Sequence, residues 1–129
     1  MKTKMILPVL VLFLASFATV EAQNKIQVNS KEVKELLKKN KDLIIIDVRT
    51  PNEFNAGHLK GALNIDVNQY DATSKIDKLN RNARYIVYCR TSNRSGMAVQ
   101  YMMQKGFKTV YQMMDGFPGW AANNFAYEK

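Results

Sequence analysis

The chain has 129 residues, of which 47% are hydrophobic, and a formal net charge of +8 at pH 7. This length is enough for one domain built around one hydrophobic core. The positive charge fits small anionic ligands, but the lysines are scattered and form no arginine-rich or aromatic-interleaved block, so nucleic acid is not an expected partner.

Residues 1–22 have the organisation of an export signal. Two lysines precede an apolar run, Met5 to Val20, which is followed by the small residue Ala22. The run is shorter than the roughly 20 apolar residues that span a bilayer. We therefore expect cleavage after Ala22, which would leave no membrane anchor on a mature domain of residues 23–129; a retained anchor is the alternative. The protein would be periplasmic if its source has two membranes, and otherwise secreted.

Strand-like and helix-like segments alternate along the mature chain. In chain order we expect a strand at 26–28, a helix capped by Asn29 and ended at 40–41, a strand at 43–46, a helix at 51–56, a strand at 62–65, a helix at 73–80, a strand at 85–88, a helix at 95–104, a strand at 109–113 and a helix at 117–125. The first two of these helices are expected to begin with capping boxes, formed by Asn29 with Glu32 and by Thr50 with Glu53.

The apolar runs 43–46 and 85–88 show no alternation, which is typical of strands that are covered on both faces. Together with the alternating order, they predict an α/β fold in which helices cover both faces of a mostly parallel sheet of about five strands. The five methionines of the mature chain are expected to fill its core rather than to bind Cu(I).

Cys89 is the only cysteine. It cannot form an internal disulfide, and a free thiol in an oxidising compartment is a liability unless it reacts or is buried. Cys89 directly follows the predicted strand 85–88, and ligands of open α/β sheets bind beyond the carboxyl ends of strands. The position therefore makes Cys89 the first candidate for a catalytic residue.

A short loop joins Cys89 to the next predicted helix, and its residues suit an anion. They are Arg90, Thr91, Ser92, Asn93, Arg94 and Ser95. The N–H groups of the loop and the helix N-terminus would favour the thiolate, the nucleophilic form of Cys89. The arginines, hydroxyls and amide could hold an anionic substrate. This hypothesis requires a thiol that is open to small sulfur-bearing anions; the alternative is an inert core cysteine.

Four segments, taken in order, resemble the single-domain rhodaneses, a family of sulfurtransferases. They are Asp47 to Arg49 with Glu53 and Phe54, then Gly57 to Ile65, then Tyr88 to Ser95, and finally Asp115 to Trp120. The resemblance implies a rhodanese-like fold and a thiosulfate sulfurtransferase. In that activity Cys89 would take sulfane sulfur from thiosulfate or a similar donor, hold it as a persulfide and pass it to a thiophilic acceptor such as cyanide or a thiol.

Two positions depart from the pattern of that family, because Ser92 and Asp115 stand where glycine is frequent. If the backbone at Ser92 needs a positive φ, the side chain would cost roughly 1 kcal/mol. Donor preference is therefore left open, and the effect of Asp115 is not predicted.

Two other functions are compatible with a reactive Cys89. The first is a sulfur-relay or binding module, in which Cys89 receives sulfur from a partner carrier protein that docks on the basic surface. The second is a phosphatase or arsenate reductase. Cysteine phosphatases of related fold have one more residue between the cysteine and the arginine than separates Cys89 from Arg94, so the shorter loop favours sulfur transfer.

Three further polar residues are predicted to support the site. Asp47 and Arg49 end a strand at the same edge as Cys89, where a buried ion pair that braces the loop is expected, with substrate contact as the alternative. His58 is the only histidine. We expect a structural role for it, because a thiolate that attacks a sulfane sulfur needs no proton shuttle. One cysteine and one histidine predict no zinc or iron site, and no cofactor is expected.

Overall fold

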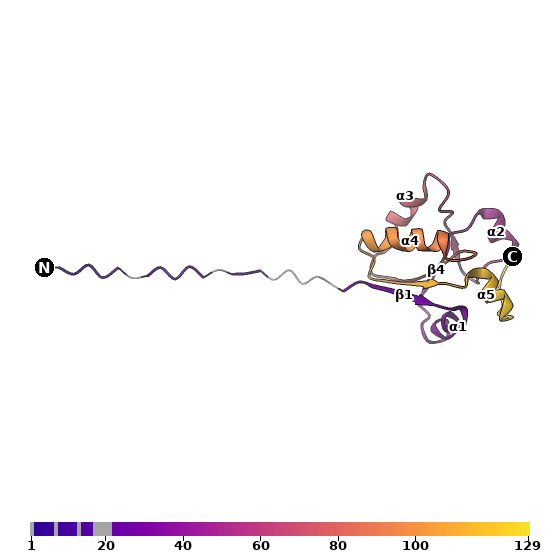
Figure 1. Cartoon of the computed structure of the whole chain (residues 1–129), viewed down its shortest axis with the longest axis horizontal. Helices are drawn as coiled ribbons and strands as arrows, with labels where there is room; N and C mark the ends of the chain where they lie inside the picture. The colour runs from indigo at the N-terminus through magenta and orange to yellow at the C-terminus, as the bar shows by residue number, and fades with distance from the viewer. Residues whose placement is uncertain (1, 7, 13, 17–21) are drawn as a thin grey trace.

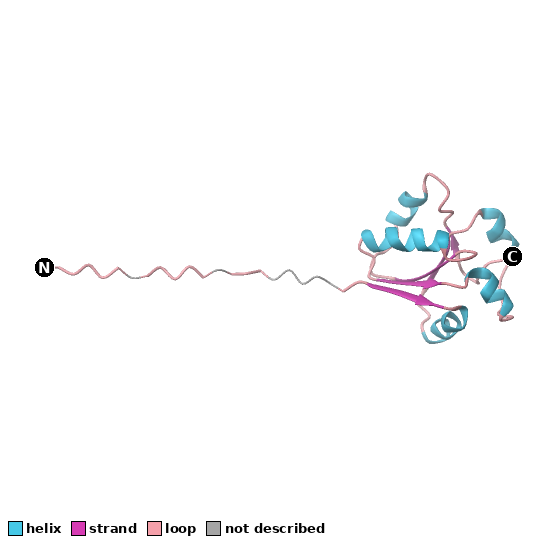
Figure 2. Ribbon diagram, in the orientation of Figure 1, coloured by secondary structure: helices cyan, strands magenta, loops and turns pink. Residues whose placement is uncertain are grey.

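The chain folds around a five-stranded sheet (Figure 1). The computed structural model describes residues 2–6, 8–12, 14–16 and 22–129. The strands are β1 (Asn24–Val28), β2 (Ile44–Asp47), β3 (Leu63–Asn64), β4 (Arg84–Tyr88) and β5 (Thr109–Met113). The helices are α1 (Ser30–Lys39), α2 (Pro51–Ala56), α3 (Ala72–Asp77), α4 (Asn93–Gln104) and α5 (Gly116–Ala122). The strand order is β1-β5-β4-β2-β3 and every pairing is parallel, which confirms the predicted α/β fold (Figure 2).

Helices cover both faces of the sheet, as predicted (Figure 1). On β2 the side chain of Ile46 packs with α3 and α4, whereas that of Ile45 packs with α1 and α5. This alternation follows from the strand geometry, in which successive side chains point to opposite faces. Met102 and Met113 are buried in the core, but Met97 is 60% exposed on α4, so core filling does not account for all five methionines.

Both predicted capping boxes are present and start α1 and α2. The Asn29 side chain accepts the N–H of Glu32 at 2.9 Å, and Glu32 accepts the N–H of Asn29 in return. Thr50 and Glu53 form the same pair at the start of α2. Each box satisfies two N–H groups that lack a partner within the helix, which explains why these helices begin where the sequence predicts.

Other helix boundaries differ from the sequence-based expectation. The helix predicted at 95–104 begins earlier, because the N–H of Gly96 donates to the carbonyl of Ser92 at 2.8 Å and so extends the first turn. The helix predicted at 117–125 ends earlier, before Asn124 adopts a φ of 56°. α3 likewise ends sooner than predicted. The early start of α4 matters most, since it places the end of the Cys89 loop within a helix.

The N-terminal segment contains no helix or strand in its described parts, which are 2–6, 8–12 and 14–16 (Figure 1). Across the residues that the structure describes, no helix has both the length and the apolar character needed to cross a membrane. The predicted export signal falls partly on residues 1, 7, 13 and 17–21, which lie outside the described residues. Signal and cleavage site therefore stay predictions.

Candidate functional site

Cys89 lies at the carboxyl end of β4, which pairs with β2 on one side and β5 on the other. Its side chain packs in the apolar cluster between the sheet and the helices α3 and α4. The carbonyl of Tyr88, just before it, accepts the N–H of Val48 at 3.0 Å. The end of β4 is thus held in the middle of the sheet, and Cys89 follows a buried strand, as the sequence predicted.

The N-terminus of α4 points at the sulfur. The N–H of Ser95, in the first turn of α4, donates to Cys89 Sγ at 3.3 Å, and the Cys89 thiol can donate to Ser95 Oγ at 3.4 Å. First-turn N–H groups have no partner within their own helix, and the aligned peptide dipoles give this end a partial positive charge. The first turn of α4 therefore places a backbone donor and the positive end of a helix beside Sγ.

A buried amide from β5 completes the hydrogen bonds around this turn. Gln112 Nε2 donates to the carbonyl of Ser92 and to Ser95 Oγ, each at 3.0 Å. Ser95 Oγ also lies 3.2 Å from the Ser92 carbonyl oxygen. Gln112 was not among the predicted site residues, although its amide side chain, which lies between Tyr111 and Met113 in a predicted strand, was a usable signal. Gln112 connects β5 to the group that contacts the sulfur.

The expectation of an open thiol is wrong for this structure, because Cys89 is 0% exposed. The segment that begins α5 packs directly on the backbone of Cys89 and Arg90. Phe117 N donates to the Cys89 carbonyl at 2.9 Å. Gly116 adopts a φ of 61°, and a Cβ there would collide with the carbonyl oxygens of both residues. The start of α5 therefore fixes the backbone at Cys89 by close packing that no local pattern reveals, while the side chain of Cys89 packs in the apolar cluster with α3 and α4.

The two arginines of the loop have different surroundings. Arg94 forms a two-pronged ion pair with Glu53 of α2, with Nη1–Oε1 at 2.6 Å and Nη2–Oε2 at 2.9 Å. The hydrogen bonds that Arg94 donates to Glu53 raise the pKa of Arg94, and attraction to the Cys89 sulfur acts in the same direction. Arg90 is exposed, and no ion pair among the described residues involves it. Arg90 therefore has no carboxylate partner among the described residues. Arg94 is paired with Glu53, and no local sequence pattern predicted this pair.

The remaining loop residues lie close to Cys89 in the chain but do not all face its sulfur. Thr91 and Asn93 are exposed, and of the predicted substrate-binding residues only Ser95 hydrogen-bonds Sγ within the described part of the chain. Ser92 has a φ of −130°, so the strain that a positive φ would cause at this position does not arise. The loop thus tolerates serine where the family often has glycine.

Asp47 and Arg49 form a buried ion pair beneath the site. Arg49 Nη2 donates to Asp47 Oδ2 at 2.6 Å and to the carbonyl of Gly57 at 2.6 Å. The guanidinium carbon lies 4.6 Å from the ring centroid of Phe117. Burial alone would lower the pKa of Arg49, but its hydrogen bonds with Asp47 raise it. The predicted buried ion pair is present, and these contacts join the end of α2 to the start of α5.

His58 contacts structural groups with both ring nitrogens. Nδ1 lies 2.8 Å from the carbonyl of Phe54, and Nε2 lies 3.5 Å from Glu128 near the C-terminus. The ring stacks on Phe54 at 3.7 Å, and the backbone of His58 pairs with that of Glu128. The predicted structural role agrees with this arrangement. In the described ranges, no group of His, Cys, Asp or Glu side chains is arranged to hold a metal ion.

Asp115 has a contact that its sequence context did not reveal. Its carboxylate accepts hydrogen bonds from the backbone N–H and the hydroxyl of Ser30, the first residue of α1. This contact connects the start of α5 to the start of α1. Because Gly116 and Phe117 follow directly, Asp115 helps to fix the segment that packs on the backbone of Cys89.

A hollow of about 290 Å³ lies beside the loop and is lined by charged and apolar groups. Its lining residues are Arg49, Glu53, Ala56, Arg90, Phe117 and Pro118. Cys89 does not line it. The exposed guanidinium of Arg90 makes this hollow suitable for a small anion that approaches the loop.

Comparisons with known proteins agree on one family. The rhodanese-like domain family matches residues 29–123 of the chain. Thiosulfate sulfurtransferase GlpE of Coxiella burnetii is 31% identical over 98 residues, which cover 76% of this chain and 89% of that protein. The uncharacterized protein YqhL of Bacillus subtilis is 37% identical over 76 residues, so this chain matches only 59% of that relative. The polysulfide-sulfur transferase homodimer of Wolinella succinogenes has a similar structure, with 25% identity, a TM-score of 0.68, and coverage of 81% of this chain and 78% of that chain.

Proposed function

Because this chain belongs to the rhodanese-like domain family, we propose that it is a sulfurtransferase that carries sulfur on Cys89 as a persulfide. The observation that carries the proposal is the Ser95 N–H, which donates to Cys89 Sγ at 3.3 Å from the first turn of α4. The same positive helix end that stabilises a thiolate also stabilises the negative terminal sulfur of a persulfide.

The proposed reaction has two sulfur-transfer steps. In the first, the Cys89 thiolate attacks the outer sulfur of thiosulfate or a similar donor, the sulfur–sulfur bond of the donor breaks, and its electron pair leaves with sulfite. In the second, a thiophilic acceptor such as cyanide or a thiolate attacks the terminal sulfur of the persulfide. The Cys89 thiolate is then restored, so no cofactor is consumed.

Access to the sulfur requires a movement, since Cys89 is fully enclosed. The side chains of Arg90, Thr91 and Asn93 are exposed, so we propose that this segment moves to admit the donor. An anionic donor would first dock by Arg90 in the adjoining hollow. Arg90 is thus proposed to bind the donor, and Ser95 to hold the sulfur.

Mass spectrometry after incubation with thiosulfate tests the proposal. We expect a single added sulfur on Cys89, its removal by cyanide with formation of thiocyanate, and no addition in the Cys89→Ser variant. A wild-type protein that gains no sulfur from thiosulfate, polysulfide or any persulfidated protein would rule out sulfur transfer. Hydrolysis of an aryl phosphate that depends on Cys89 would favour the phosphatase instead.

The enclosed thiol favours one second candidate, the sulfur-relay module. If a partner protein must open the loop, free thiosulfate would react slowly, whereas a persulfidated carrier protein would react rapidly. Comparing the two donors at equal concentration distinguishes an independent thiosulfate sulfurtransferase from a relay.

We also propose that residues 1–22 direct export. The apolar run and the small residue at its end support this proposal. Intact mass of the protein recovered from the producing cell would begin at Gln23 if the signal is cleaved after Ala22. A full-length mass in the membrane fraction would instead indicate a retained anchor.

A further inference from the structure

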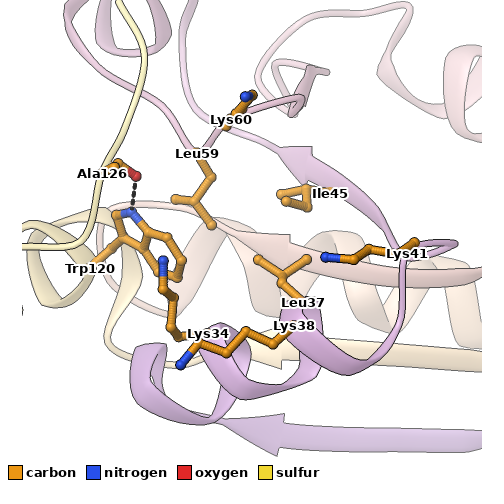
Figure 3. Close-up of a pocket in the computed structure, with 9 residues that line it drawn as sticks. All are labelled: Lys34, Leu37, Lys38, Lys41, Ile45, Leu59, Lys60, Trp120 and Ala126. Atoms are coloured by element: carbon orange, nitrogen blue, oxygen red, sulfur yellow. Dashed lines mark hydrogen bonds between the residues drawn. The ribbon is translucent and has the colours of Figure 1, made fainter.

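A second hollow, of about 250 Å³, opens on the α1 and α5 face of the sheet, opposite the cluster that contains Cys89 (Figure 3). Its apolar lining comes from Leu37, Ile45, Leu59, Trp120 and Ala126. Its charged lining consists of Lys34, Lys38, Lys41 and Lys60. No carboxylate lines the hollow, so an apolar floor is surrounded by positive charge alone.

Most of this positive charge has no counter-ion. Lys38 pairs with Glu35 at 3.1 Å, but no ion pair among the described residues involves Lys34, Lys41 or Lys60. Lys34 Nζ lies 5.8 Å from the ring centroid of Trp120, where the ring face attracts it. The rim of the hollow therefore favours negatively charged groups.

The floor offers no free polar group that could orient a ligand. The Trp120 indole N–H already donates to the Ala126 carbonyl at 3.0 Å, as Figure 3 shows. The volume is below the range of about 300–1,000 Å³ typical of small-molecule sites, but it accommodates an apolar side chain. Specific recognition must therefore come from the lysines on the rim.

We propose that this hollow docks an acidic segment of a partner protein, which inserts one apolar side chain between the lysines. The lysines come from α1, from the loop that follows it and from the loop after α2 (Figure 3). Because the ammonium groups come from three separate elements, they favour a segment that carries several carboxylates. This docking surface is separate from Cys89 and does not depend on the proposed sulfur chemistry.

Trp120 provides a direct probe, because it is the only tryptophan and lines the hollow. The ligand is a synthetic peptide in which Asp and Glu flank a central Leu. We expect it to shift the tryptophan fluorescence saturably, with an affinity that weakens as salt is added. A peptide with Asn and Gln in place of the acids, and an acidic peptide with Ser in place of Leu, should both bind much more weakly.

Paired lysine variants localise the binding. The double variant Lys41→Gln and Lys60→Gln removes two rim charges and should weaken binding about tenfold, or about threefold per exposed charge pair. The double variant Lys31→Gln and Lys78→Gln changes the net charge equally at exposed lysines outside the hollow and should leave the affinity unchanged. Cys89→Ser should also bind normally, so failure of the sulfur chemistry would not affect this result.

Three outcomes would overturn the proposal. The first is the absence of saturable binding by the acidic peptide. The second is an equal loss of affinity in the two double variants, which would show attraction by overall charge. The third is tight binding of octanoate or of anionic phospholipid vesicles without binding of the peptide, which would assign the hollow to a small amphiphile or a membrane surface.

Discussion

The Ser95 hydroxyl is shared by three groups at the candidate site. It lies within hydrogen-bond distance of Cys89 Sγ, of the Ser92 carbonyl and of Gln112 Nε2. A hydroxyl has one proton, so Ser95 can donate either to the carbonyl or to a sulfur anion. Because Gln112 also donates to the Ser92 carbonyl, that oxygen keeps a partner when Ser95 turns toward a thiolate. Gln112 is therefore a positioning residue for the charged form of Cys89.

Replacing Gln112 by Leu should remove this support while keeping a similar volume. We expect slower persulfide formation from thiosulfate and a loss of about 1–3 kcal/mol in the free energy of unfolding. Single-turnover mass spectrometry and urea titration measure these quantities. Gln27→Leu is the control, since exposed Gln27 pairs with Gln112 in the sheet register. An unchanged rate of persulfide formation in Gln112→Leu would contradict the positioning role.

Ser92 needs no glycine-like backbone, since its φ is −130°. Ser92→Gly should therefore relieve no strain and should lower the free energy of unfolding by about 0.5–1 kcal/mol, because glycine gains more freedom in the unfolded chain. Urea unfolding of the wild type, Ser92→Gly and Ser92→Ala measures the effect. A glycine variant more stable than the wild type would show that strain exists at this position.

At the scale of elements, an ion pair joins the first turns of α2 and α4. Glu53 belongs to the capping box of α2 and also pairs with Arg94. A positive charge at a helix N-terminus is unfavourable, and the Glu53 carboxylate offsets it. The pair therefore fixes α2 against the helix whose N-terminus faces Cys89, but it also withholds the Arg94 charge from a substrate anion.

Glu53→Gln should release that charge while preserving the capping box, since glutamine also serves at this helix position. We expect a several-fold lower KM for thiosulfate at low ionic strength, and a loss of about 1 kcal/mol in stability. Steady-state kinetics with cyanide as acceptor give the KM. The matched control is Glu35→Gln, which removes the exposed pair with Lys38 on α1 and should leave the KM unchanged. A raised KM in Glu53→Gln would instead indicate that the ion pair positions the loop for the donor.

The ion pair between Glu53 and Arg94 predicts that the protein becomes less stable at low pH. The hydrogen bond from Arg94 lowers the pKa of Glu53 from 4.5 to about 2. A carboxyl group whose pKa is lower in the folded protein than in the unfolded chain stabilises the fold at pH values above its unfolded pKa. This stabilisation is lost as the pH falls from 4.5 toward 2. The free energy of unfolding of the wild type should therefore fall more steeply through this range than that of Glu53→Gln. Parallel slopes in urea titrations at several pH values would show that the pair contributes no acid-sensitive stability.

At the scale of the molecule, the strand order separates two surfaces. β4 lies inside the sheet and delivers Cys89 to its carboxyl edge, toward the α3 and α4 side. The lysine-rimmed hollow opens on the α1 and α5 side. The C-terminal segment pairs with the backbone of His58, just after α2, and accepts a hydrogen bond from Trp120, which lines the hollow. Its contacts therefore connect parts of the fold that are distant in sequence.

Deletion of residues 126–129 tests this connection. It removes the backbone pair with His58, the acceptor for Trp120 and the edge-to-face contact of Tyr127 with Phe117. The free energy of unfolding should fall by roughly 2–4 kcal/mol, from several hydrogen bonds and an aromatic pair. Urea titration followed by tryptophan fluorescence measures the loss, and deletion of Lys129 alone is the control. Equal stability of the two truncated chains would show that the segment does not support the fold.

The sequence predicted the elements well where local patterns decide them. The capping boxes at Asn29 and Thr50, and the apolar runs in β2 and β4, depend on neighbouring residues and were found at their predicted places. The predicted helix boundaries were less accurate where a single turn decides them. An example is α4, which begins at Asn93 in the Cys89 loop rather than at residue 95. The sequence also identified the lone cysteine at the end of a buried strand, together with the family that this segment resembles.

Only the tertiary structure decided how that cysteine is surrounded. The pairing of Arg94 with Glu53, the support from Gln112 and the closure of Gly116 over the Cys89 backbone each join segments that are far apart in the chain. Such contacts depend on how strands and helices pack in three dimensions, whereas capping and strand patterns depend on a few adjacent residues. The sequence alone therefore determined the candidate reactive group and its place in the fold, and packing determined that its sulfur is enclosed.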